Sequence, residues 1–186
     1  MLQWCFYFLA KYPEVRRNVQ KEIDESNYDI SKPLSYEEYQ KGFNYVKAVM
    51  NESLRLKPPA NVIGRLTKKD VNIGGYNIPQ DVDVWILIRC LHEDESYWGK
   101  DVLEFRPERF LERKIDPYYF IPFGFGSRKC LGMKFAEMEA TLMLIKAMKL
   151  FNCSIPNGKE DSLSEEIQEF FLQPKYDIEL NFEKRK

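Results

Sequence analysis

The sequence predicts a mainly α-helical chain with small β-sheets, which places it in the α+β class. Three observations predict this class. Apolar residues recur at helical spacing before residue 58 and again after residue 130, whereas residues 71–88 alternate around a pair of glycines. A proline-, charge- and aromatic-rich stretch with little periodicity separates these regions. The length of 186 residues suits one domain or a large piece of one, and 44% hydrophobic residues are enough to build its core.

The first predicted helical segment covers residues 2–23. Trp4, Phe8 and Leu9 stand at helical spacing, and Pro13 is expected to break or restart the helix. The apolar start of this segment is ten residues long. That is too short to span a bilayer, which needs ~20 residues, so we expect a core helix here. The start also lacks the basic region of a signal peptide.

The second predicted helical region begins at Ser35, which forms with Glu38 the sequence signature of a capping box. Gly42 is expected to split this region into two helices, and Pro58 and Pro59 are expected to end it. One apolar stripe at helical spacing runs along it: Tyr39, Phe43, Val46 and Met50.

The middle of the chain changes period. Gly74–Gly75 lies at the centre of the alternating stretch "DVNIGGYNIP", which predicts a hairpin. A buried strand is predicted for the next stretch, "VDVWILIRC". We expect an ordered meander for "EFRPERFLERKIDPYYFIPFG".

Near the C-terminus, a stretch that is apolar nearly all round follows Cys130: "LGMKFAEMEATLMLIKAMKLF". It predicts a helix that begins just after the cysteine and is buried on most sides. The tail is predicted to combine a turn-rich stretch, "SIPNGKEDS", with a strand pair that ends in "YDIELNF".

The charges nearly balance, with 28 basic and 29 acidic residues and a net charge of −1. A nucleic-acid partner would require a basic surface, so the sequence predicts no nucleic-acid binding. The cysteines are widely spaced and form no CxxC pair, and His92 does not complete a zinc site with them at any usual spacing. Two disulfides are arithmetically possible, but the chain is not cysteine-dense, which favours reduced thiols and an intracellular location. The four cysteines are Cys5, Cys90, Cys130 and Cys153.

The most unusual stretch is "PFGFGSRKCLG", residues 122–132, in which Cys130 stands among glycines and basic residues. The N-terminus of a following helix and the charges of Arg128 and Lys129 favour a thiolate there. Gly126 and Gly132 leave room for a flat, bulky ligand to approach the backbone. Spacing alone leaves three interpretations open: a metal-bound thiolate, a structural cysteine, and a nucleophile that would require a base.

Sequence motifs narrow these interpretations. "ESLR" at residues 52–55 resembles the E-x-x-R pair of the cytochrome P450 family, and "FRPERF" at residues 105–110 resembles its P-E-R-F element. Between them, "KKDVNIGGYNIP" and "LHEDESYW" also fit the family. The resemblance covers essentially all 186 residues but only the C-terminal part of the family's chain. Five residues match the family's haem-binding signature, F-x-x-G-x-R-x-C-x-G: Phe123, Gly126, Arg128, Cys130 and Gly132.

The resemblance implies a haem-thiolate monooxygenase that inserts one oxygen atom of O2 into an apolar organic substrate. Cys130 is then the axial ligand of the iron in haem b, iron protoporphyrin IX. Arg65 and Arg128 are implied as partners of the haem propionates, and Phe123, Gly126 and Gly132 as part of the cofactor-binding loop. His92 is expected either near the haem edge or in a structural role, and a lone histidine favours the latter.

Glu52, Arg55 and Arg109 are implied to form a buried network that supports the cysteine-bearing meander. From the residues alone, Glu52 and Arg55 share a helix face, and an exposed pair of that kind would contribute only a few tenths of a kcal/mol. The family pattern instead buries all three. By the same resemblance, the substrate pocket includes Ala60, Val62 and Ile63 of the segment 60–63, and Phe171 within Phe170–Leu172.

The implied partners are an electron-donating reductase and an apolar small molecule, with Lys129 and Lys134 near the reductase-docking face. The family's proton-delivery residues and membrane anchor would precede Met1, so we expect no catalytic residue within the chain. We therefore expect a truncated family member, a single partial domain over residues 1–186. The endoplasmic reticulum membrane is the expected location of a full-length relative. The alternative is a haem-binding remnant, or an interaction module without turnover.

Overall fold

The computed structural model describes residues 1–157, 159, 165–168 and 171–185. The helices are α1 Leu2–Lys11, α2 Pro13–Glu25, α3 Tyr36–Lys41, α4 Asn44–Leu56, α5 Ile88–His92, α6 Glu95–Trp98, α7 Arg109–Glu112 and α8 Met133–Leu150. The strands are β1 Val62–Leu66, β2 Val71–Ile73, β3 Tyr76–Ile78, β4 Asp83–Leu87, β5 Phe151–Ser154, β6 Glu166–Gln168, β7 Leu172–Pro174 and β8 Asn181–Lys184. These elements confirm the predicted α+β class.

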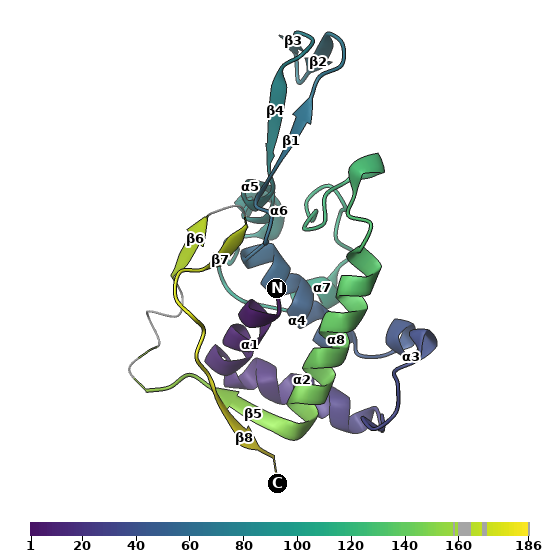
Figure 1. The fold of residues 1–186 in the computed structure, drawn as a ribbon, viewed down its shortest axis with the longest axis vertical. Coiled ribbons are helices and arrows are strands. Elements are labelled where there is room, and N and C mark those ends of the chain that lie inside the picture. Colours follow the sequence, from purple (N-terminus) through teal and green to yellow (C-terminus); the bar gives the residue numbers. More distant parts are fainter. Residues whose placement is uncertain (158, 160–164, 169–170, 186) are drawn as a thin grey trace.

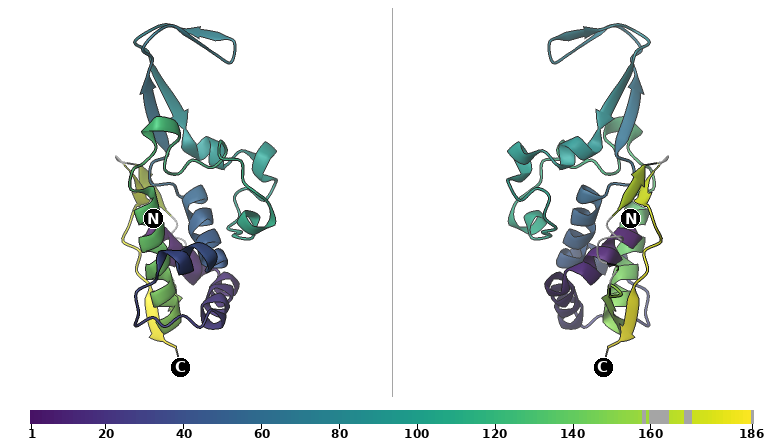
Figure 2. Two further views of the ribbon diagram at one scale, coloured as in Figure 1. Left: turned by 90° about the vertical axis from the view of Figure 1, so that its right-hand side faces the viewer. Right: turned by 90° about the vertical axis from the view of Figure 1, so that its left-hand side faces the viewer.

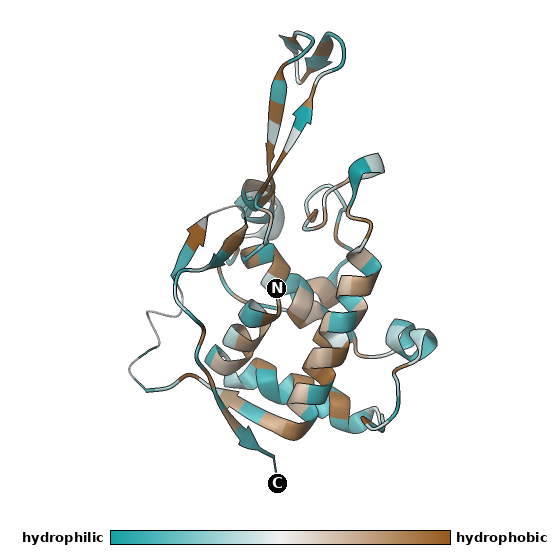
Figure 3. Cartoon of the chain, viewed as in Figure 1, coloured by the Kyte–Doolittle hydropathy of each residue, from teal (hydrophilic) through white to brown (hydrophobic). Residues whose placement is uncertain are grey.

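Helices α1, α2, α4 and α8 pack against one another and form the body of the molecule (Figure 1). Each contributes fully buried apolar side chains to one core, and Phe105 of the meander stacks on Phe8 with ring centroids 4.2 Å apart. The hydropathy colouring shows how apolar residues recur along these helices (Figure 3). No helix within the described residues is long and apolar enough to cross a membrane.

The predicted helix boundaries in the first half of the chain are confirmed. Pro13 stands in the first turn of α2, directly after the short break that ends α1. The capping box begins α3: Ser35 Oγ accepts from the Glu38 N–H at 3.2 Å, and Glu38 Oε2 accepts from the Ser35 N–H at 2.8 Å. Gly42 ends α3, so the second helical region is split as expected.

Helix α4 is capped from another helix. Its N-cap residue, Phe43, has a left-handed backbone with φ of 57° and supplies no side-chain cap. Glu22 of α2 takes over this function, because its carboxylate accepts from the N–H groups of Tyr45 at 2.8 Å and Val46 at 2.9 Å. A carboxylate at a helix N-terminus accepts hydrogen bonds from the free N–H groups and interacts favourably with the helix dipole. The helix that carries Glu52 and Arg55 is therefore fixed to α2.

An antiparallel hairpin of β1 and β4 projects from the body, with β2 and β3 at its tip (Figures 1 and 2). The predicted turn is confirmed: Gly74 and Gly75 both have positive φ, 58° and 90°. The strand predicted in "VDVWILIRC" is present as β4, but the prediction that it is buried is wrong. Trp85 is 63% exposed, because the hairpin projects away from the helices, and from Ile88 the chain turns into α5.

Helix α8 is only partly buried, contrary to the prediction. Its second half packs on α2 and α4 through Leu144 and Met148, which are fully buried. Its first turns extend past the body, which leaves Phe135 73% exposed. The helix also begins at Met133 rather than directly after Cys130, because residues 131 and 132 form a turn.

The tail strands belong to two separate two-stranded sheets, so the prediction of one strand pair there is incomplete. β6 pairs with β7, whereas β8 pairs with β5, which directly follows α8. Residues 176–180 of the stretch "YDIELNF" precede β8 and are not in a strand. Part of the predicted turn-rich stretch, residues 158 and 160–162, lies outside the described residues.

Candidate functional site

A cavity of about 370 Å³ opens between β1, the first half of α8 and the segment that precedes β7. We call it the Cys130 cavity. The stretch of residues 122–132, the cysteine loop, supplies one wall. The cavity is lined by Met1, Leu54, Pro59, Ala60, Ile63, Arg65, Ile88, Pro122, Phe123, Gly124, Arg128, Cys130, Ala136 and Phe171.

The cysteine loop is shaped by glycines and two backbone hydrogen bonds. Gly124 and Gly126 have positive φ, 75° and 70°, a conformation that residues with a Cβ adopt at a cost. The Gly124 N–H donates to the Ile121 carbonyl at 2.9 Å, and the Cys130 N–H donates to the Phe123 carbonyl at 2.9 Å. The loop therefore closes on itself and fixes the backbone of Cys130.

Cys130 differs from the other thiols of the chain. All four cysteines are free. Cys5 and Cys153 are buried in the core, and this burial raises the pKa of both thiols. Cys90 is exposed but does not line the Cys130 cavity. Cys130 is exposed and lines it. Among the four, it alone combines access with a place in a predominantly apolar cavity.

Two guanidinium groups give the Cys130 cavity positive charge. Arg65 reaches it from β1 and donates through Nη1 to the Gly64 carbonyl at 2.8 Å. Arg128 reaches it from the 3₁₀ turn that precedes the cysteine. Neither forms an ion pair with an acidic side chain in the part of the chain that the structure describes. Both charges are therefore available to an anionic group in the cavity.

Most of the residues that the resemblance assigned to the site meet in this cavity, but three do not. Val62 points to the opposite face of the hairpin from Ile63, since neighbouring residues of a strand alternate. Gly126 and Gly132 shape the loop without lining the cavity; a Cβ on Gly132 would lie 4.0 Å from Cys130 Sγ, an ordinary contact. Phe170 lies outside the described residues. Those that meet are Ala60, Ile63, Arg65, Phe123, Arg128, Cys130 and Phe171.

Behind the cysteine loop, Glu52, Arg55 and Arg109 form what we call the buried ion cluster. Arg55 binds Glu52 with two hydrogen bonds, Nε to Oε2 at 2.7 Å and Nη2 to Oε1 at 2.8 Å. Arg109 Nε donates to Glu52 Oε1 at 3.0 Å. All three side chains are at most 1% exposed. The interpretation as an exposed helix pair is therefore excluded.

The buried ion cluster also holds the meander by its backbone. Arg55 Nη1 donates to the His92 carbonyl at 2.8 Å, and Arg109 Nη2 donates to the Asp101 carbonyl at 3.0 Å. The N–H of Arg106 donates to Glu52 Oε1 at 3.0 Å. Sequence analysis missed Asp101, whose carboxylate also pairs with Arg109 at 3.3 Å. No sequence pattern predicted this contact, because Asp101 stands eight residues before Arg109 in a stretch without periodicity.

A second ion cluster fixes the segment that carries Phe171. Glu166 of β6 pairs with Lys57, at the end of α4, and with Arg89 of α5. The Leu172 N–H donates to the Pro59 carbonyl at 2.7 Å. The hairpin of β6 and β7 is thereby attached beside the Cys130 cavity. No sequence motif at Glu166 predicted these contacts.

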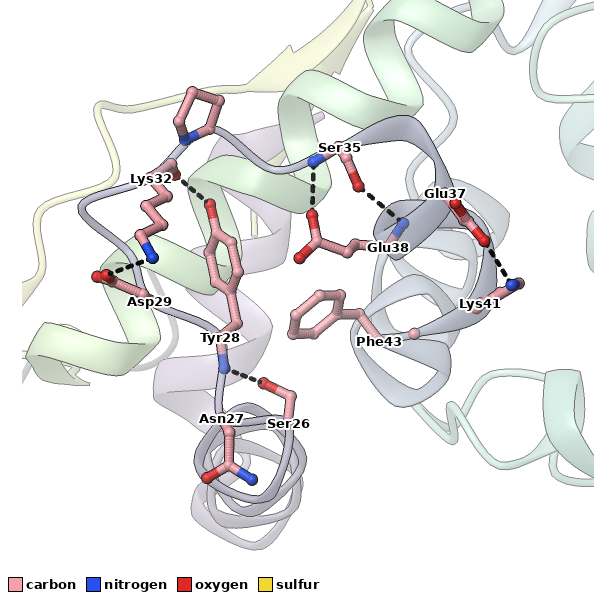
Figure 4. Close-up of a pocket in the computed structure, with 12 residues that line it drawn as sticks. Ser26, Asn27, Tyr28, Asp29, Lys32, Ser35, Glu37, Glu38, Lys41 and Phe43 are labelled. Carbon is pink, nitrogen blue, oxygen red and sulfur yellow. Dashed lines mark hydrogen bonds and ion pairs between the residues drawn. The ribbon is translucent and has the colours of Figure 1, made fainter.

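A larger surface hollow of about 950 Å³ lies elsewhere, between the end of α2 and α3 (Figure 4). Its polar groups mostly bond to one another: Tyr28 Oη donates to the Lys32 carbonyl at 2.6 Å, and Glu37 pairs with Lys41 at 2.6 Å. None of the site residues predicted from the sequence lines it. We therefore place the candidate site at the Cys130 cavity.

The residues of the Cys130 cavity fit a haem. One accessible thiol can bind the iron, apolar side chains such as Ile63 and Phe123 can pack on a macrocycle, and two guanidinium groups can bind carboxylates. This donor set is that of the haem-thiolate proteins. A sequence model of the family described as Cytochrome P450 matches residues 1–182, so the chain belongs to the cytochrome P450 family. The cytochrome P450 family is one of monooxygenases, which are oxidoreductases.

Similar curated proteins include Cytochrome P450 3A16 of Mus musculus, 39% identical over 178 residues, and Cytochrome P450 3A5 of Homo sapiens, 39% identical over 188 residues. These alignments cover 94% and 100% of this chain. The Lithocholate 6-beta-hydroxylase of Mesocricetus auratus is 37% identical over 175 residues, which is 92% of this chain. The chain spans about a third of the length of these relatives, 34%, 36% and 34% respectively.

Proposed function

We propose that the chain binds haem b through the thiolate of Cys130 and forms the thiolate-bearing side of a monooxygenase site. One observation carries the proposal: the accessible thiol, both predicted arginines and all of the predicted apolar residues except Val62 line the same cavity. These residues come from segments as far apart as 60–65, 123–130 and 171. A match of sequence motifs does not by itself require these segments to meet at one cavity.

In this proposal each side chain has a separate task. Cys130 binds the iron, with its backbone held by the bond from its N–H to the Phe123 carbonyl. Arg65 and Arg128 bind the propionates. Ile63 and Phe171 exclude water and orient an apolar substrate. When bound, the haem would supply activation of O2 and insertion of one oxygen atom into that substrate.

The test is the absorbance of the haem-loaded, reduced chain under carbon monoxide. Thiolate ligation gives a red-shifted Soret band, and we expect Cys130→Ser to abolish it. Cys90→Ser is the matched control, because Cys90 is also exposed but lies outside the cavity, and it should keep the band. A red-shifted band that survives in Cys130→Ser would refute the proposed ligand.

The same proposal includes an electron-donating reductase and an apolar substrate, as the family resemblance implies. Lys129 and Lys134 belong to the face that would receive the reductase. The location of the chain stays a prediction: we expect it to be intracellular, and we expect a full-length relative to lie in the endoplasmic reticulum membrane. The partner is tested directly by adding a microsomal reductase to the haem-loaded chain. The absorbance of the haem then reports whether electrons are transferred to it.

A further inference from the structure

His92 lies between the buried ion cluster and the cysteine loop, and its side chain is fully buried. Its Nε2 accepts a hydrogen bond from the Ile121 N–H at 3.0 Å. Its Nδ1 lies 3.2 Å from the Arg55 carbonyl oxygen. An N–H can only donate and a carbonyl can only accept, so both contacts are satisfied by one form, neutral imidazole with its proton on Nδ1.

His92 and Arg55 hold each other reciprocally. The imidazole donates to the Arg55 backbone, while Arg55 Nη1 donates to the His92 backbone carbonyl at 2.8 Å. The same guanidinium is bound to Glu52 by two hydrogen bonds. The position of the imidazole is therefore set by Arg55 of the buried ion cluster, which stands 37 residues earlier in the chain.

From His92, a short series of hydrogen bonds leads to the cysteine. Ile121 donates its N–H to the imidazole and accepts the Gly124 N–H at its carbonyl, 2.9 Å away. Phe123, inside that turn, accepts the Cys130 N–H at 2.9 Å. Ile121 is itself 6% exposed, and the Phe120 ring packs on the imidazole with centroids 5.2 Å apart. Ile121 is thus the point at which the loop is attached to the core.

We infer that His92 is a positioning residue for Cys130: by accepting the Ile121 N–H, it fixes the start of the cysteine loop to the buried ion cluster and so sets where the thiol lies. The inference rests on the proposed function, because the position of Cys130 matters for the reaction only if that residue binds the iron. Burial lowers the pKa of His92 to about 4, so the neutral form is present at pH 7.

Two conservative substitutions separate the two hydrogen bonds of the imidazole. His92→Gln places an amide oxygen near the position of Nε2, where it can accept the Ile121 N–H. His92→Asn places its amide near Nδ1, where it can serve Arg55 but does not reach Ile121. His92→Phe removes both bonds at similar volume. Thr141→Val is the control, since it removes a buried hydroxyl whose hydrogen bond among the described residues is made within α8, to the Glu137 carbonyl at 2.7 Å.

Amide hydrogen exchange of the chain without haem is the measurement. We expect the exchange rate of the Gly124 and Cys130 amides to rise about tenfold in His92→Asn and His92→Phe, as expected for loss of one buried hydrogen bond that holds a loop. In His92→Gln and Thr141→Val it should stay near the wild-type rate. Amides of α2 and α8 should change little in any variant.

Three results would overturn the inference: unchanged loop exchange in His92→Asn, loop exchange in His92→Gln equal to that in His92→Phe, or an equal rise throughout α2 and α8. The last result would show that His92 supports the whole fold rather than the loop. Because no haem is present, the outcome does not depend on the identity of the iron ligand. Failure of the proposed function is detected separately, by the spectrum of Cys130→Ser.

Discussion

At the scale of single residues, buried charge is the feature with the largest energetic consequence. Arg55 has no exposed surface and donates to Glu52, to the His92 carbonyl and to the Glu104 carbonyl. Arg109 donates to Glu52 and to three further backbone carbonyls. Removing one partner leaves the others buried without full compensation, which costs far more than loss of a surface pair.

We therefore expect Arg109→Ala to lower the free energy of unfolding by about 3–5 kcal/mol. The control is Arg106→Ala in the same motif, because the Arg106 side chain is 38% exposed in its pairs with Asp101 and Glu112. That change should cost about 1 kcal/mol or less. Urea denaturation followed by circular dichroism measures both. Equal losses of unfolding free energy in the two variants would mean that the burial of Arg109 adds nothing to its contribution to stability.

The same cluster allows a test of coupling. Glu52→Ala and Arg55→Ala should each destabilise the fold, and the double variant should cost less than the sum of the two, since both single changes remove one shared interaction. Urea denaturation of the three variants completes the cycle. Additive, small losses would instead indicate two independent side chains.

The stability of the chain should also depend on pH through His92. Burial lowers its pKa from an ordinary value of 6.5 to about 4. The unfolded chain therefore binds a proton more readily than the folded one between these values, so stability is full above about pH 6.5 and falls as the pH falls toward 4. Between pH 7 and pH 5 we expect a loss of about 2 kcal/mol from this residue.

The comparison with His92→Gln isolates that contribution, because glutamine does not titrate while the carboxylates of the chain are unchanged. Urea denaturation at pH 7 and pH 5 should show a smaller loss in the variant than in the wild type. The same loss of stability in both proteins would show that the pKa of His92 does not differ between the folded and unfolded states as its burial implies.

At the scale of elements, local sequence determined the boundaries well. Pro13, the capping box of Ser35 and the pair Gly74–Gly75 act within a few residues, and the structure has a break, a helix start and a turn at these places. Exposure of whole elements was not predictable in this way. Whether Trp85 is covered depends on where the hairpin lies relative to the helices, which the alternation of its residues does not encode.

The hairpin of β6 and β7 illustrates an element held by charge. Glu166, whose carboxylate is 21% exposed, bridges Lys57 and Arg89. Burial alone would raise the pKa of this carboxyl, but the two cations outweigh that effect and lower it. Phe171 is in the segment that this anchor attaches beside the Cys130 cavity. Loss of the Glu166 charge should therefore loosen the hairpin and leave the helical body intact.

We expect Glu166→Gln to raise amide exchange in residues 171–175 severalfold and to cost about 1 kcal/mol in the free energy of unfolding. Glu165→Gln is the matched control, since Glu165 pairs only with Lys175 among the described residues and both are close to half exposed. It should change exchange little. Hydrogen exchange with mass spectrometry distinguishes the two variants, and identical behaviour would argue against the anchor.

At the scale of the whole molecule, the candidate site depends on contacts that the sequence encodes at long range. The motifs predicted Glu52, Arg55 and Arg109 as a network, and the structure shows them in contact across 57 residues. They did not predict that His92 reaches Ile121, since this bond depends on how α5 and the meander lie together. Whether Cys130 binds iron stays a prediction, because it concerns a group outside the chain.

The exposed face of the projecting hairpin has a consequence for solution behaviour. Trp85 and Leu87 share one face of β4 and are 63% and 53% exposed. Leu66 of β1 is 44% exposed and pairs with Asp83, two residues before Trp85 on the same face. Contiguous apolar surface of this kind favours association. We expect the chain to self-associate as its concentration rises, and Trp85→Lys to reduce this severalfold.

Analytical ultracentrifugation measures that association. Leu103→Lys is the control, because Leu103 is 71% exposed on the turn just before the meander, outside the hairpin strands. If both substitutions reduce association equally, the hairpin face is not the surface responsible.

The distance between the hairpin tip and the C-terminus offers a use in spectroscopy. The hairpin of β2 and β3 and the strand β8 lie near opposite ends of the longest axis (Figure 1). Exposed turn tips tolerate insertions better than most positions, so a fluorescent donor can be introduced at this turn and an acceptor after β8. Energy transfer between the two dyes would then report the end-to-end dimension of single molecules, in crude lysate as well as in purified samples.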